Sequence, residues 1–261
     1  MLYLIILLVI LFLSYKLIDI HTHDIEINRK TLRLKNVNNE LTILHLSDLH
    51  FDFNKKFQKK LVNMVNNLEY DLLVFTGDYL NGEEYLVNLD LFLKKIENNK
   101  RSYAILGNND QKFKNELITL FNENNIKFLN NQSEKLIVND DNVNIIGVDT
   151  PDLGKDDYNK AINDVDLDNN FNLLLSHTYH ITEKEQLDNI DLVLVGDTHG
   201  GQINLPILNN IANRRYELKY KTGLYNFNNK TLFVNKGIGT TLLPIRINCK
   251  PEIVLININK K

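Results

Sequence analysis

Cysteine is almost absent from this sequence, which contains a single one, Cys249, among 261 residues. A lone cysteine excludes a disulfide within the chain and offers no cysteine cluster for zinc. Any bound metal would therefore be held by histidine, asparagine and carboxylate side chains. The compartment stays undecided, because exported proteins without disulfides are common.

An excess of positive charge is also missing, since the formal net charge is -3 at pH 7. Without a basic field the chain has no general attraction to nucleic acid, so nucleic acid is not an expected partner. No segment has the composition of a low-complexity region. With 43% hydrophobic residues, the chain has enough apolar side chains for one substantial core. We therefore expect a monomer with one catalytic domain and a small appendage.

The N-terminus lacks the features of a cleaved signal peptide. Residues 2–13 are all apolar or tyrosine, and apolar residues continue to Ile20, but no lysine or arginine precedes the run and no A-x-A pattern follows it. Because about 20 apolar residues span a bilayer, we expect a transmembrane anchor at residues 1–20 and a single-pass location in the cell membrane. A buried N-terminal helix is the alternative. The basic residues after the run leave the side of the membrane undecided.

Residues 21–40 are polar, and we expect them to form a juxtamembrane linker and a first strand, ahead of a catalytic domain at 41–261. Within that domain an apolar run, a polar cluster and a segment with helical periodicity follow one another three times. The runs are 42–47, 71–76 and 103–106, and the helical segments are 55–68, 86–96 and 113–121. This order predicts an α/β sheet with polar clusters at the carboxyl ends of its strands.

The pattern changes in the second half of the chain. Residues 135–138 and 143–148 are strand-like and are separated by Asn and Asp residues, which predicts a hairpin. Four more apolar runs follow, at 173–176, 192–195, 231–234 and 253–256. We therefore predict two sheets packed face to face, with helices outside.

Oxygen and imidazole donors follow these strands in five short clusters. Each cluster alone is ordinary, because aspartate caps helices and Gly-Asp forms turns. Together they supply seven donors of a kind that suits manganese, iron or zinc rather than copper or an iron-sulfur cluster. The seven are Asp48, His50, Asp78, Asn108, His177, Asp197 and His199.

The order D-x-H, G-D, G-N-x-D, S-H and G-x-T-H-G-G-Q resembles the calcineurin-like metallophosphoesterases over nearly all of residues 41–258. The C-terminal motifs are similar to those of the membrane-associated, YkuE-type bacterial branch. The resemblance implies a four-layer α-β-β-α sandwich of two mixed sheets. It also implies hydrolysis of a phosphomonoester, phosphodiester or pyrophosphate bond by a hydroxide shared between two divalent ions. Manganese is expected ahead of iron, zinc or magnesium, because the carboxylate of Asp197 shifts the preference away from zinc.

The resemblance also divides the seven donors between two metal ions and a bridge. It assigns Asp48, His50 and His199 to the first ion, Asn108, His177 and Asp197 to the second, and Asp78 to both. Asp197 stands where the family has a histidine. A carboxylate still binds a hard divalent ion, so this departure changes which metal is expected rather than whether one binds.

Asn109 is a second departure, because it replaces a family histidine that stabilises the transition state or protonates the leaving oxygen. An amide donates a hydrogen bond but delivers no proton. General acid catalysis contributes about 10²- to 10⁴-fold, so its loss predicts a slow enzyme or a preference for good leaving groups, such as a lipid-linked pyrophosphate. His180 could replace the missing acid. A catalytically impaired binding or scaffold protein at the membrane is the alternative.

Three further residues have expected roles. Arg246 and Lys236 are candidates to contact a substrate phosphate, and surface charges on a terminal hairpin are an equal alternative. Asp110 is expected to cap a helix or to orient Asn109.

Overall fold

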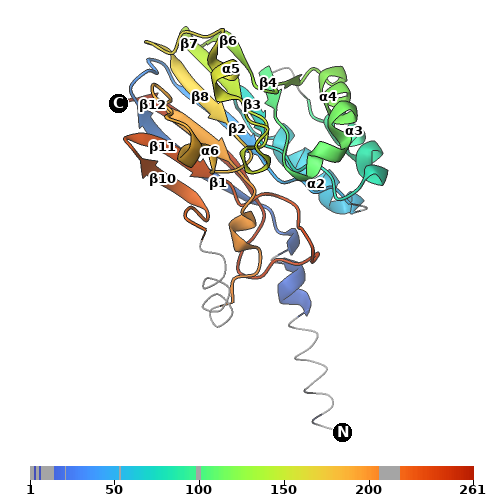
Figure 1. Cartoon of the computed structure of the whole chain (residues 1–261). Coiled ribbons are helices and arrows are strands. Elements are labelled where there is room, and N and C mark those ends of the chain that lie inside the picture. Colours follow the sequence, from blue (N-terminus) through green and yellow to red (C-terminus); the bar gives the residue numbers. More distant parts are fainter. Residues whose placement is uncertain are drawn as a thin grey trace.

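The computed structural model describes residues 3, 6, 15–20, 22–52, 54–97, 101–205 and 218–261. Its strands form two sheets that lie one over the other (Figure 1). The first sheet has the order β1-β12-β2-β3-β4-β5 and the second the order β10-β11-β9-β8-β7-β6.

Parallel strands form the centre of the first sheet. β2, β3, β4 and β5 run parallel, while β12 is antiparallel to β2 and parallel to β1. Their bounds are β1 (Glu26–Leu34), β2 (Leu41–Leu46), β3 (Leu72–Phe75), β4 (Arg101–Ala104), β5 (Lys127–Phe128) and β12 (Glu252–Lys260). β1 pairs with β12 from Glu26 to Leu34, so this part of the stretch assigned to the linker and first strand belongs to the sheet.

The second sheet is also mixed. β7, β8, β9 and β11 are parallel, and β6 and β10 are antiparallel to their neighbours. Their bounds are β6 (Gln132–Val138), β7 (Asp141–Gly147), β8 (Phe171–Leu175), β9 (Leu192–Val195), β10 (Gly223–Phe227) and β11 (Lys230–Val234). The predicted hairpin is confirmed: Asn139 and Asp140 both have positive φ, as its two-residue turn requires.

Three apolar clusters hold the layers together. One lies between the sheets and contains Ile43, Val74, Leu173 and Leu194, while the others join each sheet to its helices. The helices are α2 (Lys55–Asn66), α3 (Leu86–Leu93), α4 (Lys114–Glu123), α5 (Tyr158–Ile162) and α6 (Ile181–Lys184). The prediction of an α/β sandwich with two mixed sheets and outer helices is therefore confirmed.

The N-terminal part of the chain is described only in pieces. Residues 15–20 are helical, and the predicted anchor at 1–20 lies mostly outside the described residues. No helix among the residues that the structure describes is long and apolar enough to cross a bilayer. The predicted transmembrane helix is thus not confirmed.

Candidate metal centre

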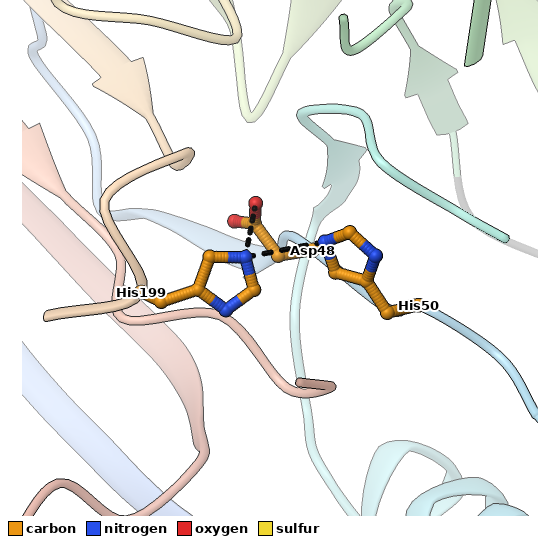
Figure 2. A group of neighbouring side chains, drawn as sticks. All are labelled: Asp48, His50 and His199. Atoms are coloured by element: carbon orange, nitrogen blue, oxygen red, sulfur yellow. Dashed lines mark hydrogen bonds and ion pairs between the residues drawn. The ribbon is translucent and has the colours of Figure 1, made fainter. Parts of the chain in front are cut away.

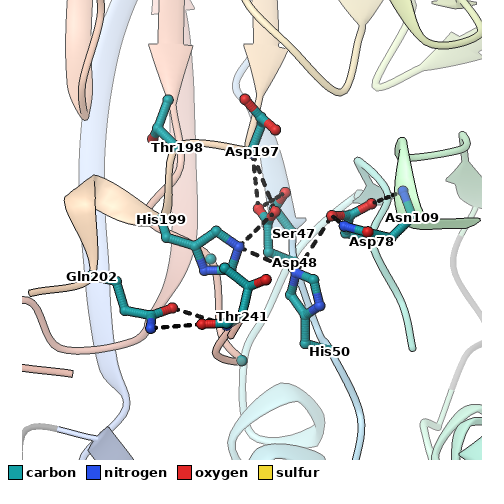
Figure 3. A network of polar contacts seen from close by, with 12 residues as sticks. Ser47, Asp48, His50, Asp78, Asn109, Asp197, Thr198, His199, Gln202 and Thr241 are labelled. Atoms are coloured by element: carbon teal, nitrogen blue, oxygen red, sulfur yellow. Dashed lines mark hydrogen bonds and ion pairs between the residues drawn. The ribbon is translucent and has the colours of Figure 1, made fainter. Parts of the chain in front are cut away.

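Loops at the carboxyl ends of the parallel strands bring the predicted donors together (Figure 3). From the first sheet, β2 leads to Asp48 and His50, β3 to Asp78 and β4 to Asn108. From the second sheet, β8 leads to His177, and β9 to Asp197 and His199. Residues separated by about 150 positions thus meet because the parallel strands of both sheets end at the same edge of the sandwich.

Asp48, His50 and His199 form the first cluster (Figure 2). All three are buried, and one ligand atom of each lies within 4.8 Å of the others. The Nε2 atoms of His50 and His199 are 3.2 Å apart, and Asp48 Oδ1 is 3.5 Å from His199 Nε2. Two donors bound to one ion at about 2.1 Å, with an angle of about 90–110° between them, are separated by about 3.0–3.4 Å. The three residues therefore fit the ligand set of a single ion.

Asp78 lies between two histidines. Its Oδ2 is 3.4 Å from His50 Nε2, and its Oδ1 is 3.5 Å from His177 Nε2. Asp48, Asp78 and His177 form a second buried cluster with ligand atoms within 4.8 Å. Each oxygen of Asp78 therefore faces a different histidine, which is the geometry needed for a carboxylate that bridges two ions.

The two other donors assigned to the second ion lie beside His177. Asn108 Oδ1 is 3.0 Å from His177 Nε2, and Asp197 Oδ1 is 3.6 Å from the same atom. The Asp197 side chain keeps 28% exposure, and its carboxylate points away from Asp48 (Figure 3). Asn108 and His177 thus lie together as expected, while Asp197 is at the rim of the centre.

Hydrogen bonds on the outer side of two histidines leave Nε2 free to bind a cation. His50 Nδ1 is 3.0 Å from the Asn81 side-chain oxygen, and the Asn81 amide donates to the His50 carbonyl. His177 Nδ1 donates to the Thr76 carbonyl at 2.7 Å. With the proton on Nδ1, each Nε2 directs its lone pair into the centre. Asn81 and Thr76 were missed in the sequence, although both adjoin the Gly-Asp motif.

Buried carboxyl groups make the centre electrostatically unusual. Burial raises the pKa of Asp48 to about 7 and that of Asp110 to about 7. Burial also opposes ionisation of Asp78, but His177 and His50 outweigh it and lower the pKa of this carboxyl. The carboxylates in turn raise the pKa of His177 against the effect of burial. Without cations, protons must neutralise part of this charge, so the donor set fits divalent ions.

Asp110 organises the backbone around Asp78. It is fully buried and accepts hydrogen bonds from the backbone N–H groups of Gly107, Asp78 and Tyr79 at 2.7, 2.7 and 2.9 Å. The expected role of Asp110 as a helix cap or as the group that orients Asn109 is therefore corrected, because its oxygens accept from these three amides.

The Asn109 side chain contacts the bridging carboxylate. Its amide nitrogen is 2.5 Å from Asp78 Oδ2, and its backbone N–H donates to Asp78 Oδ1 at 3.0 Å. His180 is half-buried and stacks on Tyr179, with ring centroids 4.6 Å apart. Its Nδ1 has no hydrogen-bond partner among the described residues. Asn109 thus lies at the centre, and the acid role of His180 stays a prediction.

The two basic residues expected to contact a substrate phosphate bind groups of the protein instead. The Arg246 side chain is fully buried and donates to the carbonyls of Gly239 and Lys236, with Nη2 3.3 Å from His199 Nδ1. Lys236 forms ion pairs with Glu26 and Glu252. We therefore do not retain Arg246 as a substrate contact, because its donors face the protein interior, and Lys236 is neutralised by two carboxylates.

Comparisons with known proteins agree with this geometry. A family model described as calcineurin-like phosphoesterase matches residues 41–201. The uncharacterized metallophosphoesterase YkoQ of Bacillus subtilis (strain 168) is 28% identical over 245 residues, which cover 89% of this chain and 90% of YkoQ. The uncharacterized metallophosphoesterase YkuE of the same organism is 30% identical over 224 residues, covering 83% of this chain and 78% of YkuE. The phosphodiesterase YaeI of Escherichia coli (strain K12) is 30% identical over 86 residues, 33% of this chain and 32% of YaeI.

Proposed function

Because this chain belongs to the calcineurin-like phosphoesterase family, as its motifs indicated, we propose that it hydrolyses a phosphodiester or pyrophosphate bond with the help of two divalent metal ions. The placement of Asp78 carries this proposal, since its two oxygens face His50 Nε2 and His177 Nε2 at 3.4 and 3.5 Å. The phosphodiesterase named among the relatives is consistent with this bond type.

The residues of the centre have distinct roles in the proposed reaction. Asp48, His50 and His199 would hold one ion, Asn108, His177 and Asp197 the other, and Asp78 both. Bound divalent ions would supply Lewis acidity toward phosphoryl oxygens and would lower the pKa of water. Manganese is our first choice, because oxygen ligands outnumber imidazoles at the second ion.

Asn109 would shape the choice of substrate. Its amide can donate a hydrogen bond to a phosphoryl oxygen, but it cannot give a proton to the departing oxygen. Bonds whose leaving group is already a weak base, such as a pyrophosphate linkage, need that proton least. A lipid-linked pyrophosphate at the membrane is therefore the substrate class that we propose.

The substitution Asp78→Asn tests the proposed function. We expect it to lower manganese-dependent hydrolysis of bis(p-nitrophenyl) phosphate by about 10³-fold or more, because one neutral amide cannot replace a carboxylate that faces two cations. Asparagine tolerates the left-handed backbone of Asp78, whose φ is +57°. The matched control is Asp140→Asn, an exposed residue with φ +68° in the β6–β7 turn.

Two outcomes would contradict the proposal. Unchanged activity of Asp78→Asn would exclude a bridging role for this carboxylate. Two bound metal ions in the unaltered protein, without hydrolysis of monoesters, diesters or pyrophosphates, would favour the binding or scaffold protein that Asn109 also permits.

A further inference from the structure

The loop between β11 and β12 presents two leucines to solvent beside the metal centre. Leu242 is 100% exposed and Leu243 is 54% exposed. Leu242 also has a φ of +60°, a backbone conformation that is unfavourable for a leucine. No burial within the domain offsets this cost. The loop therefore displays apolar surface at the expense of local stability.

Hydrogen bonds to the metal-centre loop hold these leucines in place. The Gln202 amide nitrogen donates to the carbonyls of Thr241 and Leu243, both at 3.0 Å, and its oxygen accepts from the Thr241 N–H at 2.9 Å. Gln202 follows His199 by three residues, and Figure 3 shows its contacts with Thr241 next to His199. The exposed leucines thus have a fixed position relative to the centre.

The same loop is joined to the N-terminal helix. The Arg246 N–H donates to Thr22 Oγ1 at 2.8 Å, and Thr22 in turn donates to the Ile18 carbonyl at 2.7 Å. A small cavity of about 30 Å³ is lined by Thr22, His50 and Thr240. The end of the helix, the loop and a predicted metal ligand therefore lie around the same cavity. Figure 1 shows the helix leaving the domain at the end where this loop turns.

The helix adds apolar surface at this end of the molecule. Tyr15, Leu17 and Ile20 are 64%, 54% and 50% exposed. In the sequence they follow directly on the apolar run of residues 2–13. A lipid bilayer suits this combination better than a protein groove, because exposed apolar residues of the helix at 15–20 and exposed leucines of the loop both lie at this end of the domain, and the sequence before the helix is apolar.

We propose that the loop at residues 240–244 inserts Leu242 and Leu243 into the lipid surface beside the N-terminal helix, and so directs the metal centre toward the membrane. This inference depends on the proposed function only in the role that it gives to docking, which is access to a lipid-linked phosphate. The contact with lipid is independent of catalysis and can be measured without turnover.

The first test places a fluorophore on the loop. Full-length Leu242→Cys, labelled with an environment-sensitive probe, is reconstituted into vesicles of equal parts phosphatidylcholine and phosphatidylglycerol, with or without lipids that carry a quencher. Ile137→Cys is the control, because Ile137 is 62% exposed on β6. The unaltered chain, whose Cys249 is buried, gives the background of labelling. We expect quenching at position 242 to be at least about threefold stronger than at position 137, since only a side chain inserted into the bilayer comes close to the quencher.

Equal quenching at the two positions would overturn the proposal. An apolar emission from the probe at position 242 without quenching by the lipid-borne quencher would also overturn it. That result would indicate contact with a second copy of the chain or with another protein. Either result is obtained whether or not the protein hydrolyses phosphoesters, so failure of docking and failure of the proposed function are separable.

A second test uses activity. In the same vesicles, Leu242→Asn/Leu243→Asn should hydrolyse a lipid-linked pyrophosphate at least about tenfold more slowly, because two apolar side chains no longer partition into lipid. Its activity on soluble bis(p-nitrophenyl) phosphate should be unchanged. The control is Val87→Asn/Leu91→Asn, which alters two exposed apolar residues of α3. If the unaltered chain hydrolyses this substrate, equal rates for the two variants would overturn the proposal, whereas no hydrolysis by the unaltered chain would contradict the proposed function and leave the decision on docking to the quenching test.

Discussion

Asn109 stands where the motif resemblance implies a histidine. Its amide contacts Asp78 Oδ2, so the side chain lies at the metal centre, where we propose that a histidine could give a proton to a leaving oxygen. We predict that Asn109→His raises turnover of an alkyl phosphodiester by about 10²-fold, because an imidazolium can protonate an alkoxide. Hydrolysis of bis(p-nitrophenyl) phosphate should change much less, since p-nitrophenolate leaves without a proton.

The measurement for Asn109→His is the ratio of kcat/KM for the two diesters. The side chain is exposed, so a larger ring has room without repacking the core. Asn63→His, on the exposed face of α2, is the matched control. An unchanged ratio would show that Asn109 does not occupy the position of an acid.

Ser47 links Asp48 to a buried chain of hydrogen bonds. The Ser47 hydroxyl donates to Asp48 Oδ2 at 2.6 Å and accepts from Thr76 Oγ1 at 2.7 Å, and Thr76 contacts His45 Nε2 at 2.8 Å. Burial lowers the pKa of His45 to about 3, so this ring is neutral and its Nε2–H can donate to Thr76. The chain therefore fixes one oxygen of a predicted metal ligand.

The substitution Ser47→Ala should weaken manganese binding by about 10- to 100-fold, the usual effect of removing a partner of a metal ligand. Isothermal titration with manganese measures the change directly. Ser133→Ala, on the edge strand β6, is the control. An affinity equal to that of the unaltered protein would mean that Asp48 keeps its orientation without Ser47.

At the level of secondary structure, the loops that carry the donors adopt an unfavourable backbone. Asp48, His50, Asp78, Asp197 and His199 all have positive φ. Such conformations cost about 1–2 kcal/mol each and persist only where neighbouring contacts impose them. One such contact joins the loops after β2 and β3, where the Asp48 N–H donates to the Gly77 carbonyl at 2.9 Å. The centre is thus built by loops that support one another.

Gly77 lies where the loops after β3 and β4 approach each other closely. Its φ is +92°, and a Cβ here would lie 2.4 Å from the backbone nitrogen of Gly107. We predict that Gly77→Ala lowers the free energy of unfolding by about 3 kcal/mol or more, because the left-handed backbone and the backbone clash both add to the cost. Gly154→Ala should cost only about 1 kcal/mol, since Gly154 has a φ of +66° but no atom within 4 Å of the added Cβ. Urea unfolding measures both, and equal losses would contradict the clash.

The sequence predicted the strands and the metal-donor residues better than the hydrogen bonds that hold these residues in place. The runs that became β2, β3, β8 and β9 were visible because buried parallel strands are continuously apolar. Asn81 was missed and Asp110 was expected in another role, because hydrogen bonds between residues about 30 positions apart leave no periodic pattern. Arg246 was a candidate phosphate contact, with an exposed surface charge as the equal alternative, because the sequence does not show whether a guanidinium is buried and bound to carbonyls.

At the scale of the whole molecule, the metal centre depends on both sheets. Asp48 and Asp78 come from the first sheet, and His177 and His199 from the second, so the donors converge only when the sandwich is packed. A cation bound there therefore stabilises the folded state as a whole. This coupling makes global stability a direct measure of metal binding.

Loss of protons from the metal-free centre should lower the stability of the protein as pH rises. The pKa of Asp48 and that of Asp110 rise to about 7 on folding, from a usual value of 3.8, so the folded state binds more protons than the unfolded chain between these limits. The raised pKa of His177 acts in the same direction above 6.5. His50 and His199 have lowered pKa values, so they make stability rise with pH. This opposite effect ends at about pH 7, above which both histidines are neutral in the folded and the unfolded chain.

Metal removal should therefore matter most at alkaline pH. We predict that the Tm of the chelator-treated protein falls between pH 6.5 and pH 8, and that manganese at about 100 times its Kd raises Tm by about 5–10 °C at pH 8, through about 2.7 kcal/mol of binding free energy. The increase should be smaller at pH 6.5, because protons compete with the cation for the same carboxylates. Differential scanning calorimetry with and without manganese measures both effects, and Asp78→Asn should lose most of the increase. Identical Tm values with and without manganese at pH 8 would show that these clustered carboxylates and imidazoles do not hold the cation.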